Sequence, residues 1–265
     1  MLNEVNGVNG EMELKTYFIY KEKEVGAIST LEGALSKLGI KKSNSSADLI
    51  VAIGGDGTFL RAAAKFNESL ILPLRYKTHF GTLLNYDFEN MRIPLEKISS
   101  GNFFVKREPL IEASVSGRKF LSAGDFYFQR GREGSALRYN VVIKNGKSSI
   151  HISAVGDGFI VCTPLGSTGY FSYYDKLLGR KPRRIRGFGF AHILPCSISA
   201  RDNNGIDMKP KLKLMLKNNF DIKAFATRQL DQFLYSSSFK SYGIRIKAGE
   251  VMHFRRSKKT IKILI

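Results

Sequence analysis

The fold is decided by the stretch Asp48-Leu-Ile-Val-Ala-Ile-Gly-Gly-Asp56-Gly-Thr58-Phe-Leu-Arg-Ala-Ala-Ala64. Its residues 49–53 are an unbroken apolar run, typical of a strand that is buried on both faces of a parallel sheet. Glycines at positions 54, 55 and 57 then allow a tight turn and a close approach of the backbone to a ligand. We expect Thr58 to cap a helix that buries Phe59.

A strand, a glycine turn and a helix start together form an anion site, because unpaired amide N–H groups point out of the first helical turn. Asp56 is the unusual member, since a carboxylate inside a phosphate cradle repels the ligand. We expect Asp56 to take a proton from a hydroxyl group or to arrange Mg²⁺. A plain glycine turn with a solvated Asp also fits the motif when it is taken alone. The loop is neither a Walker A motif nor a Rossmann G-x-G-x-x-G fingerprint.

The segments around this motif predict a small parallel sheet. Residues 16–20 and 70–74 have the pattern of strands, and Ser29 to Glu32 forms a capping box before a helix that Gly39 ends. The β-α-β-α-β order favours right-handed crossovers, with ligands at the carboxyl ends of the strands. Asp56 lies at such an end. Residues 1 to about 12 are polar and without periodicity, and we expect them to be peripheral.

Beyond about residue 100 the pattern changes to strands separated by turns. The clearest case is residues 140–152, where Asn145-Gly146 predicts a β-hairpin. Further strand patterns lie at 211–217, 243–250 and 260–265. We therefore predict an α/β domain with a small parallel Rossmann-like sheet over residues 1–100. An antiparallel β-rich domain follows over residues 101–265, and its last strand could return to the first domain.

A second dense motif lies in the β-rich part, Gly156-Asp157-Gly158-Phe-Ile-Val-Cys162-Thr163-Pro164-Leu-Gly166-Ser167-Thr168-Gly169-Tyr170. Its residues 159–162 predict a short strand. Pro164 and Gly166 should end that strand. Ser167 and Thr168 offer hydrogen-bonding groups for a base or a ribose, and Tyr170 offers a ring for stacking. A serine-rich turn with Tyr170 in the core explains the same residues equally well.

The two motifs together resemble those of NAD kinases. The first is shared with diacylglycerol kinases, sphingosine kinases and phosphofructokinases, whereas the second, with its Gly-Ser-Thr-x-Tyr, is similar to NAD kinases in particular. The resemblance covers roughly residues 15–260 but is close only in the two motifs. It implies a homo-oligomer, a dimer or a tetramer, that binds NAD. In that family ATP or polyphosphate phosphorylates the 2′-hydroxyl of the adenosine ribose of NAD, with Mg²⁺ as helper, to give NADP.

The resemblance also implies roles for individual residues. Asp56 matches the proposed catalytic base, and the loop around it meets phosphates. Positions that match Asp157, Thr168 and Tyr170 line the dinucleotide pocket at a subunit contact. The expected binding residues are Gly55, Asp56, Gly57, Thr58, Arg61, Gly124, Asp125, Asp157, Thr163, Ser167, Thr168, Tyr170 and Tyr173. No residue is assigned as a ligand of a resident metal.

The chain departs from the family pattern at several positions. Gly124-Asp125 replaces an Asn-Glu pair, so the carboxylate reaches about one methylene less far. Leu194-Pro-Cys196-Ser stands in place of Cys-Pro-His-Ser, so the family's His is absent. Residues 171–179 replace small residues and Gly-Gly-Pro, and residues 75–84 replace a glycine-rich segment in which His79 has at most a weak role. We expect a divergent member with a reshaped pocket.

A basic run, Lys176-Leu-Leu-Gly-Arg180-Lys181-Pro-Arg183-Arg184-Ile-Arg186, carries six positive charges in eleven residues. Such a run is usually a solvated surface. The sharper interpretation is a binding strip for the phosphates of the donor or for polyphosphate. The net charge of +19, from 42 basic and 23 acidic residues, also predicts attraction to polyanions. We find no signature of nucleic-acid binding.

The composition is that of an ordinary globular protein, with 265 residues of which 43% are apolar and 25% charged. No apolar stretch approaches 18 residues, and we see no basic-then-apolar leader, so we expect a cytoplasmic protein without a membrane partner. Cys162 and Cys196 lack the spacing of a metal site or a disulfide framework.

Three functions follow from these patterns. The first is NAD kinase. The second is a lipid kinase of the diacylglycerol or sphingosine type, which shares only the first motif. The third is a non-catalytic NAD(P)-binding protein, suggested by Gly124-Asp125 and by the missing His. Retention of Asp56 and Asp157 favours the kinase.

Overall fold

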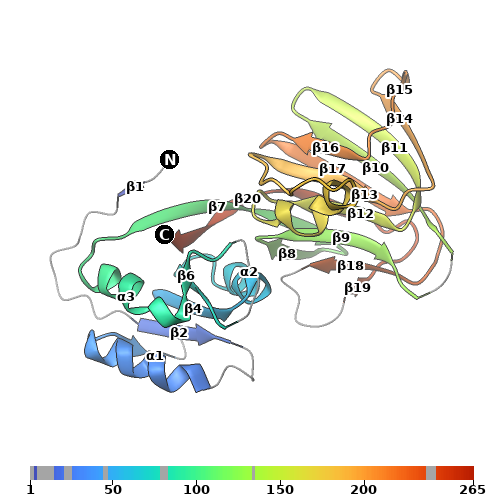
Figure 1. The fold of residues 1–265 in the computed structure, drawn as a ribbon. Coiled ribbons are helices and arrows are strands. Elements are labelled where there is room, and N and C mark those ends of the chain that lie inside the picture. Colours follow the sequence, from blue (N-terminus) through green and yellow to red (C-terminus); the bar gives the residue numbers. More distant parts are fainter. Residues whose placement is uncertain are drawn as a thin grey trace. The chain divides into compact units, whose positions relative to one another are not determined.

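The computed structural model describes residues 3–4, 15–20, 26–43, 47–77, 83–132, 135–236 and 243–265 (Figure 1). His79 lies outside these ranges. The chain divides into two compact units, which we call the first unit (Met1–Glu108 with Lys259–Ile265) and the second unit (Pro109–Lys258). None of the helices in the described ranges has the length and apolar character that a membrane-spanning helix needs.

The first unit is built on parallel strands. β2 (Lys15–Ile19), β4 (Leu49–Gly54) and β5 (Leu70–Arg75) pair in parallel, and every residue of β4 is buried, as its apolar run predicts. β3 (Lys41–Lys42) lies beside β2, and β6 (Tyr86–Asp87) lies beside the end of β5. The last residues of β20 (Met252–Leu264) pair in parallel with the start of β5. β1 (Asn3–Glu4) pairs antiparallel with the first residues of β7 (Phe104–Val115).

Helices surround this sheet. They are α1 (Gly26–Lys37), α2 (Asp56–Lys65) and α3 (Arg92–Ser99), with the 3-10 turn η2 (Phe88–Asn90) before α3. Leu31 of α1 and Leu95 of α3 share a core with Val51 of β4 and Leu72 of β5. This parallel α/β arrangement confirms the fold predicted for the N-terminal part.

The expected capping box does not begin α1. The helix starts at Gly26, so Ser29 lies inside it. Burial of Ala27 and Ile28 explains the earlier start, because their contacts with the core outweigh the local preference of Ser for a cap. The end of α1 agrees with the sequence: Gly39 has a φ of 71°, and the N–H groups of Gly39 and Ile40 donate to the carbonyls of Ser36 and Leu35.

The second unit contains two antiparallel sheets. The first has the order β15 (Asp207–Met208), β14 (Ser197–Asp202), β11 (Ser148–Gly156), β10 (Leu137–Asn145), β17 (Phe220–Ala226) and the first part of β20. The second has the order β16 (Lys213–Leu216), β13 (Phe188–Ile193), β12 (Gly158–Cys162), β9 (Asp125–Arg130), β18 (Gln232–Ser236) and β19 (Ile244–Arg245). β8 (Arg118–Ser122) forms a hairpin with β7. The predicted antiparallel β fold is therefore confirmed.

The two sheets of the second unit enclose an aromatic core. The ring of Phe159 in β12 lies 5.8 Å from that of Phe254 in β20 and 5.5 Å from that of Phe190 in β13. The outer face of β12 is covered by the segment that follows it, which contains η3 (Gly166–Thr168), η4 (Tyr170–Ser172) and α4 (Tyr173–Leu177). Phe171 of this segment packs on Ile160 and Cys162.

Candidate functional site

β4 carries the first motif to its carboxyl end. Gly54 has a φ of 145°, a conformation that residues with a side chain rarely adopt. The carbonyl of Gly55 accepts the N–H groups of Thr58 at 3.0 Å and Phe59 at 3.2 Å, which starts α2. A Cβ placed on Gly57 would meet nothing within 4 Å, so the turn is open on that side. The first turn of α2 therefore has the local geometry that the expected anion loop requires.

Thr58 is not the helix cap that the sequence predicts. α2 begins at Asp56, and Gly55 is its cap without any side-chain bond. The extended backbone of Gly55 lets the first turn begin at once, which places Thr58 on the buried face of the helix. Among the described residues the hydroxyl of Thr58 finds no hydrogen-bond partner.

Asp56 lies in the first turn of α2, where the helix dipole stabilises a negative charge. Its Oδ1 accepts a hydrogen bond of 3.2 Å from the backbone N–H of Leu83, so the carboxylate faces the segment after β5. Because Gly55 is the cap, Asp56 is not needed to begin the helix. Asp56 is therefore the first residue of α2 and does not act as its cap.

Arg75 is a candidate that sequence reasoning missed. It ends β5 and stands beside Gly54 in the register of the sheet. Its guanidinium donates to the carbonyl of Leu84 at 3.1 Å and lies 3.5 Å from the carboxylate of Asp87. The sequence signal that could have identified Arg75 is a charged residue directly after an apolar strand pattern. The expected Arg61 lies half-buried on α2.

In the second unit, two glycines fix the turn that carries Asp157. Gly158 has a φ of 136°, and a Cβ there would lie 1.8 Å from the carbonyl oxygen of Phe128. A Cβ on Gly156 would lie 2.7 Å from the Cα of Pro195. Both positions therefore require glycine for close packing of the backbone, and Asp157 is held between them.

The carboxylate of Asp157 forms an ion pair with Arg130 of β9, with Nε 2.6 Å from Oδ1. The backbone N–H of Arg130 also donates to the carbonyl of Asp157 at 3.1 Å. Arg130 is a second residue that sequence reasoning missed, since it lies 27 positions away in the chain. Any ligand that reaches Asp157 therefore also meets a positive charge.

Two of the expected binding residues, Thr163 and Gly124, make close internal contacts with the turn at Gly166. The hydroxyl of the fully buried Thr163 donates to the carbonyl of Ala123 at 2.5 Å and accepts the N–H of Gly166 at 3.2 Å. A Cβ on Gly166 would lie 2.2 Å from the carbonyl oxygen of Gly124, so the turn packs directly on the Gly124 backbone. Bulk at Gly166 would push these two segments apart.

Asp125 begins β9 opposite Cys162 of β12 and is only 8% exposed. The hydroxyls of Ser122 and Ser236 donate to its backbone carbonyl at 2.9 Å and 2.8 Å. Asp125 is thus held in a nearly closed environment.

Four half-buried tyrosines, Tyr127, Tyr170, Tyr173 and Tyr235, form what we call the tyrosine row. Tyr127 stacks on Tyr235 with ring centres 5.1 Å apart, and Tyr170 meets Tyr127 edge-on at 5.5 Å. Burial, and then the charge of Asp157, raises the pKa of Tyr170, so its phenol stays protonated and can donate a hydrogen bond. Tyr127 and Tyr235 were not predicted as site residues, although both lie in the alternating apolar pattern of the β9 and β18 strands.

A resident metal would need several ligands, and no three His, Cys, Asp or Glu side chains in the described ranges gather to hold one. Mg²⁺ usually binds through one or two carboxylates together with substrate phosphates. Asp56, beside the anion loop, fits that second arrangement.

The family model for the ATP-NAD kinase N-terminal domain matches residues 7–103 of the chain. The NAD kinase of Clostridium kluyveri is 26% identical over 165 residues, which are 60% of this chain and 57% of that protein. Over these residues the chain is similar to the NAD kinase family. The resemblance carried by the two motifs is thereby confirmed. The chain spans little more than half the length of the curated relative it matches.

Two solved structures share the fold of this chain. Yeast NADH kinase complexed with NADH has a TM-score of 0.72 at 14% identity, covering 95% of this chain and 83% of the yeast chain. An NAD kinase from Archaeoglobus fulgidus in complex with ATP has a TM-score of 0.69 at 20% identity, covering 94% of this chain and 93% of the Archaeoglobus chain. At these identities the likeness establishes the fold.

Proposed function

We propose that the protein is a cytoplasmic, homo-oligomeric NAD kinase that transfers the terminal phosphoryl group of ATP or polyphosphate to the 2′-hydroxyl of the adenosine ribose of NAD. The observation that carries this proposal is the position of Asp56. It lies beside an open glycine loop at the carboxyl end of β4, within the segment that matches the family's N-terminal domain. Ligands of parallel sheets bind at that end.

The glycine loop supplies charge stabilisation for the donor. Amides of the first turn of α2 can donate to phosphate oxygens, and the open side at Gly57 leaves room for them. Arg75, in register with Gly54, adds a positive charge to the same edge of the sheet. Phosphoryl transfer depends mainly on such positioning and neutralisation.

Asp56 provides the place for the proton. As the ribose 2′-oxygen bonds to the terminal phosphorus, its proton moves to the carboxylate of Asp56, and the bond from phosphorus to the bridging oxygen breaks. The products are NADP and ADP, or a polyphosphate that is one unit shorter. Mg²⁺ held by the donor's phosphates and Asp56 would neutralise the charge on those oxygens. The N–H of Leu83 orients the carboxylate.

The tyrosine row of the second unit is suited to the dinucleotide. Its half-buried rings offer flat surfaces for a base, and the protonated phenols can donate to ribose or amide oxygens. The Asp157–Arg130 pair presents both charges next to this row.

A non-catalytic NAD(P)-binding protein is the second candidate. It is favoured by the near burial of Asp125 and by the ion pair that occupies Asp157, since both change the expected pocket. This candidate would bind dinucleotide and show no turnover.

A coupled assay for NADP formation separates the candidates. We expect NADP to form from NAD and Mg²⁺ when ATP or polyphosphate is offered separately. Binding of NAD without NADP formation from either donor would support the non-catalytic protein. Phosphorylation of diacylglycerol, with no reaction of NAD, would instead support a lipid kinase.

A further inference from the structure

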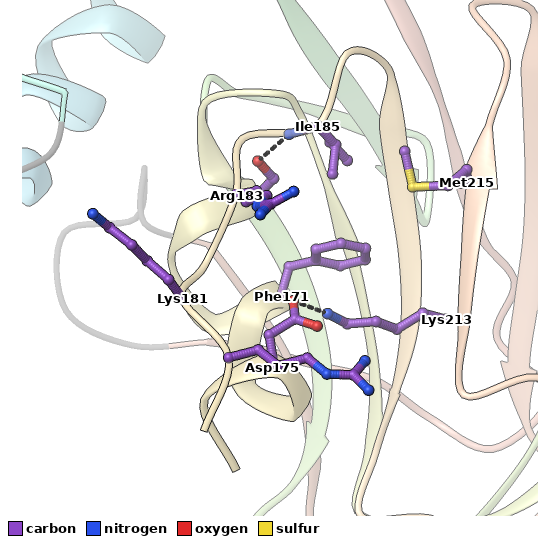
Figure 2. Close-up of a pocket in the computed structure, with 9 residues that line it drawn as sticks. Phe171, Asp175, Lys181, Arg183, Ile185, Lys213 and Met215 are labelled. Atoms are coloured by element: carbon purple, nitrogen blue, oxygen red, sulfur yellow. Dashed lines mark hydrogen bonds and ion pairs between the residues drawn. The ribbon is translucent and has the colours of Figure 1, made fainter. Parts of the chain in front are cut away.

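A cationic cavity lies in the second unit between the basic run and β16 (Figure 2). Its volume of about 630 Å³ is within the range of small-molecule sites. Its cations are Arg180, Lys181 and Arg183 of the basic run and Lys213 of β16. Figure 2 shows Phe171 at the centre, with Ile185 and Met215 beside it as an apolar wall. The cavity was not predicted, because Lys213 is distant from the basic run in sequence.

The basic run is anchored at both sides of this cavity. At its start, α4 ends at Leu177 and Gly179 follows with a φ of 66°, and the N–H of Arg180 donates to the carbonyl of Asp175 at 2.7 Å. Further along, the N–H of Ile185 donates to the hydroxyl of Ser167 at 3.1 Å. The backbone from Arg180 to Arg183 is therefore held between two hydrogen bonds, while the side chains of Arg180, Lys181 and Arg183 are exposed.

The charges around the cavity do not cancel. Lys213 is neutralised by Asp175 at 2.7 Å, and its ammonium group lies 4.6 Å from the centre of the Phe171 ring. Within the described part of the chain, no carboxylate pairs with Arg180, Lys181 or Arg183. The lining thus carries three positive charges without a carboxylate partner in the described ranges, on exposed side chains at the edge of an apolar wall.

We propose that this cavity binds a linear phosphate chain, either inorganic or carried by a nucleotide. Several negative charges on one small molecule match the three unbalanced cations, whereas a single carboxylate would leave two unmatched. Guanidinium groups also match phosphate oxygens in pairs. The proposal goes beyond the kinase proposed above, since the cavity belongs wholly to the second unit and needs no phosphoryl transfer.

Asp175 gives the proposal a specific signature. Its carboxylate repels a bound phosphate, and Lys213 offsets that repulsion. Asp175→Asn should therefore strengthen phosphate binding, whereas Lys213→Gln should weaken it by removing a cation and leaving Asp175 unpaired. A merely solvated surface would show little change in either variant, because exposed charges are screened.

The experiment is calorimetric titration of the full chain with inorganic tripolyphosphate and, separately, with ATP. The test variant is Arg180→Ala/Lys181→Ala/Arg183→Ala. The matched control is Lys144→Ala/Lys147→Ala/Lys223→Ala, which removes the same charge from exposed positions of the second unit. We expect the test variant to bind tripolyphosphate about tenfold more weakly or not at all. The control should stay within about twofold of the unchanged protein.

The two probes distinguish the sources of the phosphate chain. Weaker binding of both probes by the test variant means that phosphates alone are recognised. If the unchanged protein binds ATP and not tripolyphosphate, and the test variant loses ATP, a nucleoside is also needed. If ATP binds at the glycine loop as well, the test variant loses one site and keeps the other. Equal affinities in the test and control variants, or no binding by the unchanged protein, would overturn the proposal. NAD binding by the test variant reports separately on the proposed kinase.

Discussion

Among single residues, His192 shows how burial sets a protonation state. Its side chain is 1% exposed, and its Nδ1 lies 2.8 Å from the hydroxyl of Tyr139, which donates to the carbonyl of Gly158 at 2.6 Å. The Nε2 of His192 has no hydrogen-bond partner within the described ranges. Burial lowers the pKa of His192 from 6.5 to about 4, so the imidazole is neutral in the folded protein at pH 7.

We predict that this histidine makes stability depend on pH. As the pH falls below 6.5, this histidine becomes protonated in the unfolded chain, whereas in the folded chain it stays neutral until about pH 4. The free energy of unfolding therefore decreases as the pH falls from 6.5 to 4. The loss at pH 4.5 should be about 2–3 kcal/mol relative to pH 7. Urea unfolding at the two pH values measures it.

The variants for this test differ in burial. His192→Phe should show a smaller fall in stability between pH 7 and 4.5, whatever its absolute stability. His151→Gln, at an exposed position of β11, should behave like the unchanged protein. An identical pH dependence in His192→Phe would show that another group is responsible.

At the scale of elements, strongly patterned segments were predictable and interactions distant in sequence were not. The apolar run of β4 and the Asn145-Gly146 hairpin follow from their own residues. The starts of α1 and α2 were misplaced, because burial of Ile28 and a glycine cap at Gly55 override the local preferences of Ser and Thr. A sequence pattern carries no information about such burial.

The same contrast governs the site. Asp56 and Asp157 could be proposed from the sequence because each lies in a contiguous motif. Arg130 and Lys213 were missed, since each meets a partner that is distant in the sequence and is brought near only by the fold. The near burial of Asp125 likewise depends on β12 and β18, which lie beside β9.

Two glycines with positive φ should respond differently to alanine. Gly158→Ala places a methyl group against the backbone of Phe128, and we expect a loss of about 3 kcal/mol or more in unfolding free energy. Gly179→Ala meets open space at a φ of 66°, so only the backbone strain of about 1–2 kcal/mol remains. Denaturant unfolding compares the two, and equal losses would contradict this account of close packing.

For the whole molecule, ligand linkage offers a direct test of the acceptor. If the protein binds NAD, the folded state gains about 2.7 kcal/mol at a hundredfold excess of NAD over its Kd. Thermal unfolding should therefore move to a higher Tm with NAD and remain unchanged with diacylglycerol. A higher Tm with the lipid, and an unchanged Tm with NAD, NADH or NADP, would show that the protein does not bind a dinucleotide.

The central claim is that Asp56 accepts the proton of the ribose hydroxyl, and one pair of variants tests it most directly. Asp56→Asn keeps the size of the side chain and removes the base. Asp48→Asn is the matched control, because Asp48 precedes the amino end of β4 while Asp56 follows its carboxyl end.

The measurement is kcat for NADP formation, together with NAD binding by each folded variant. We predict that Asp56→Asn lowers kcat by about 10²–10⁴-fold while NAD still binds, since general-base assistance has that magnitude. Asp48→Asn should keep a kcat close to that of the unchanged protein. Near-normal turnover in Asp56→Asn would contradict the account.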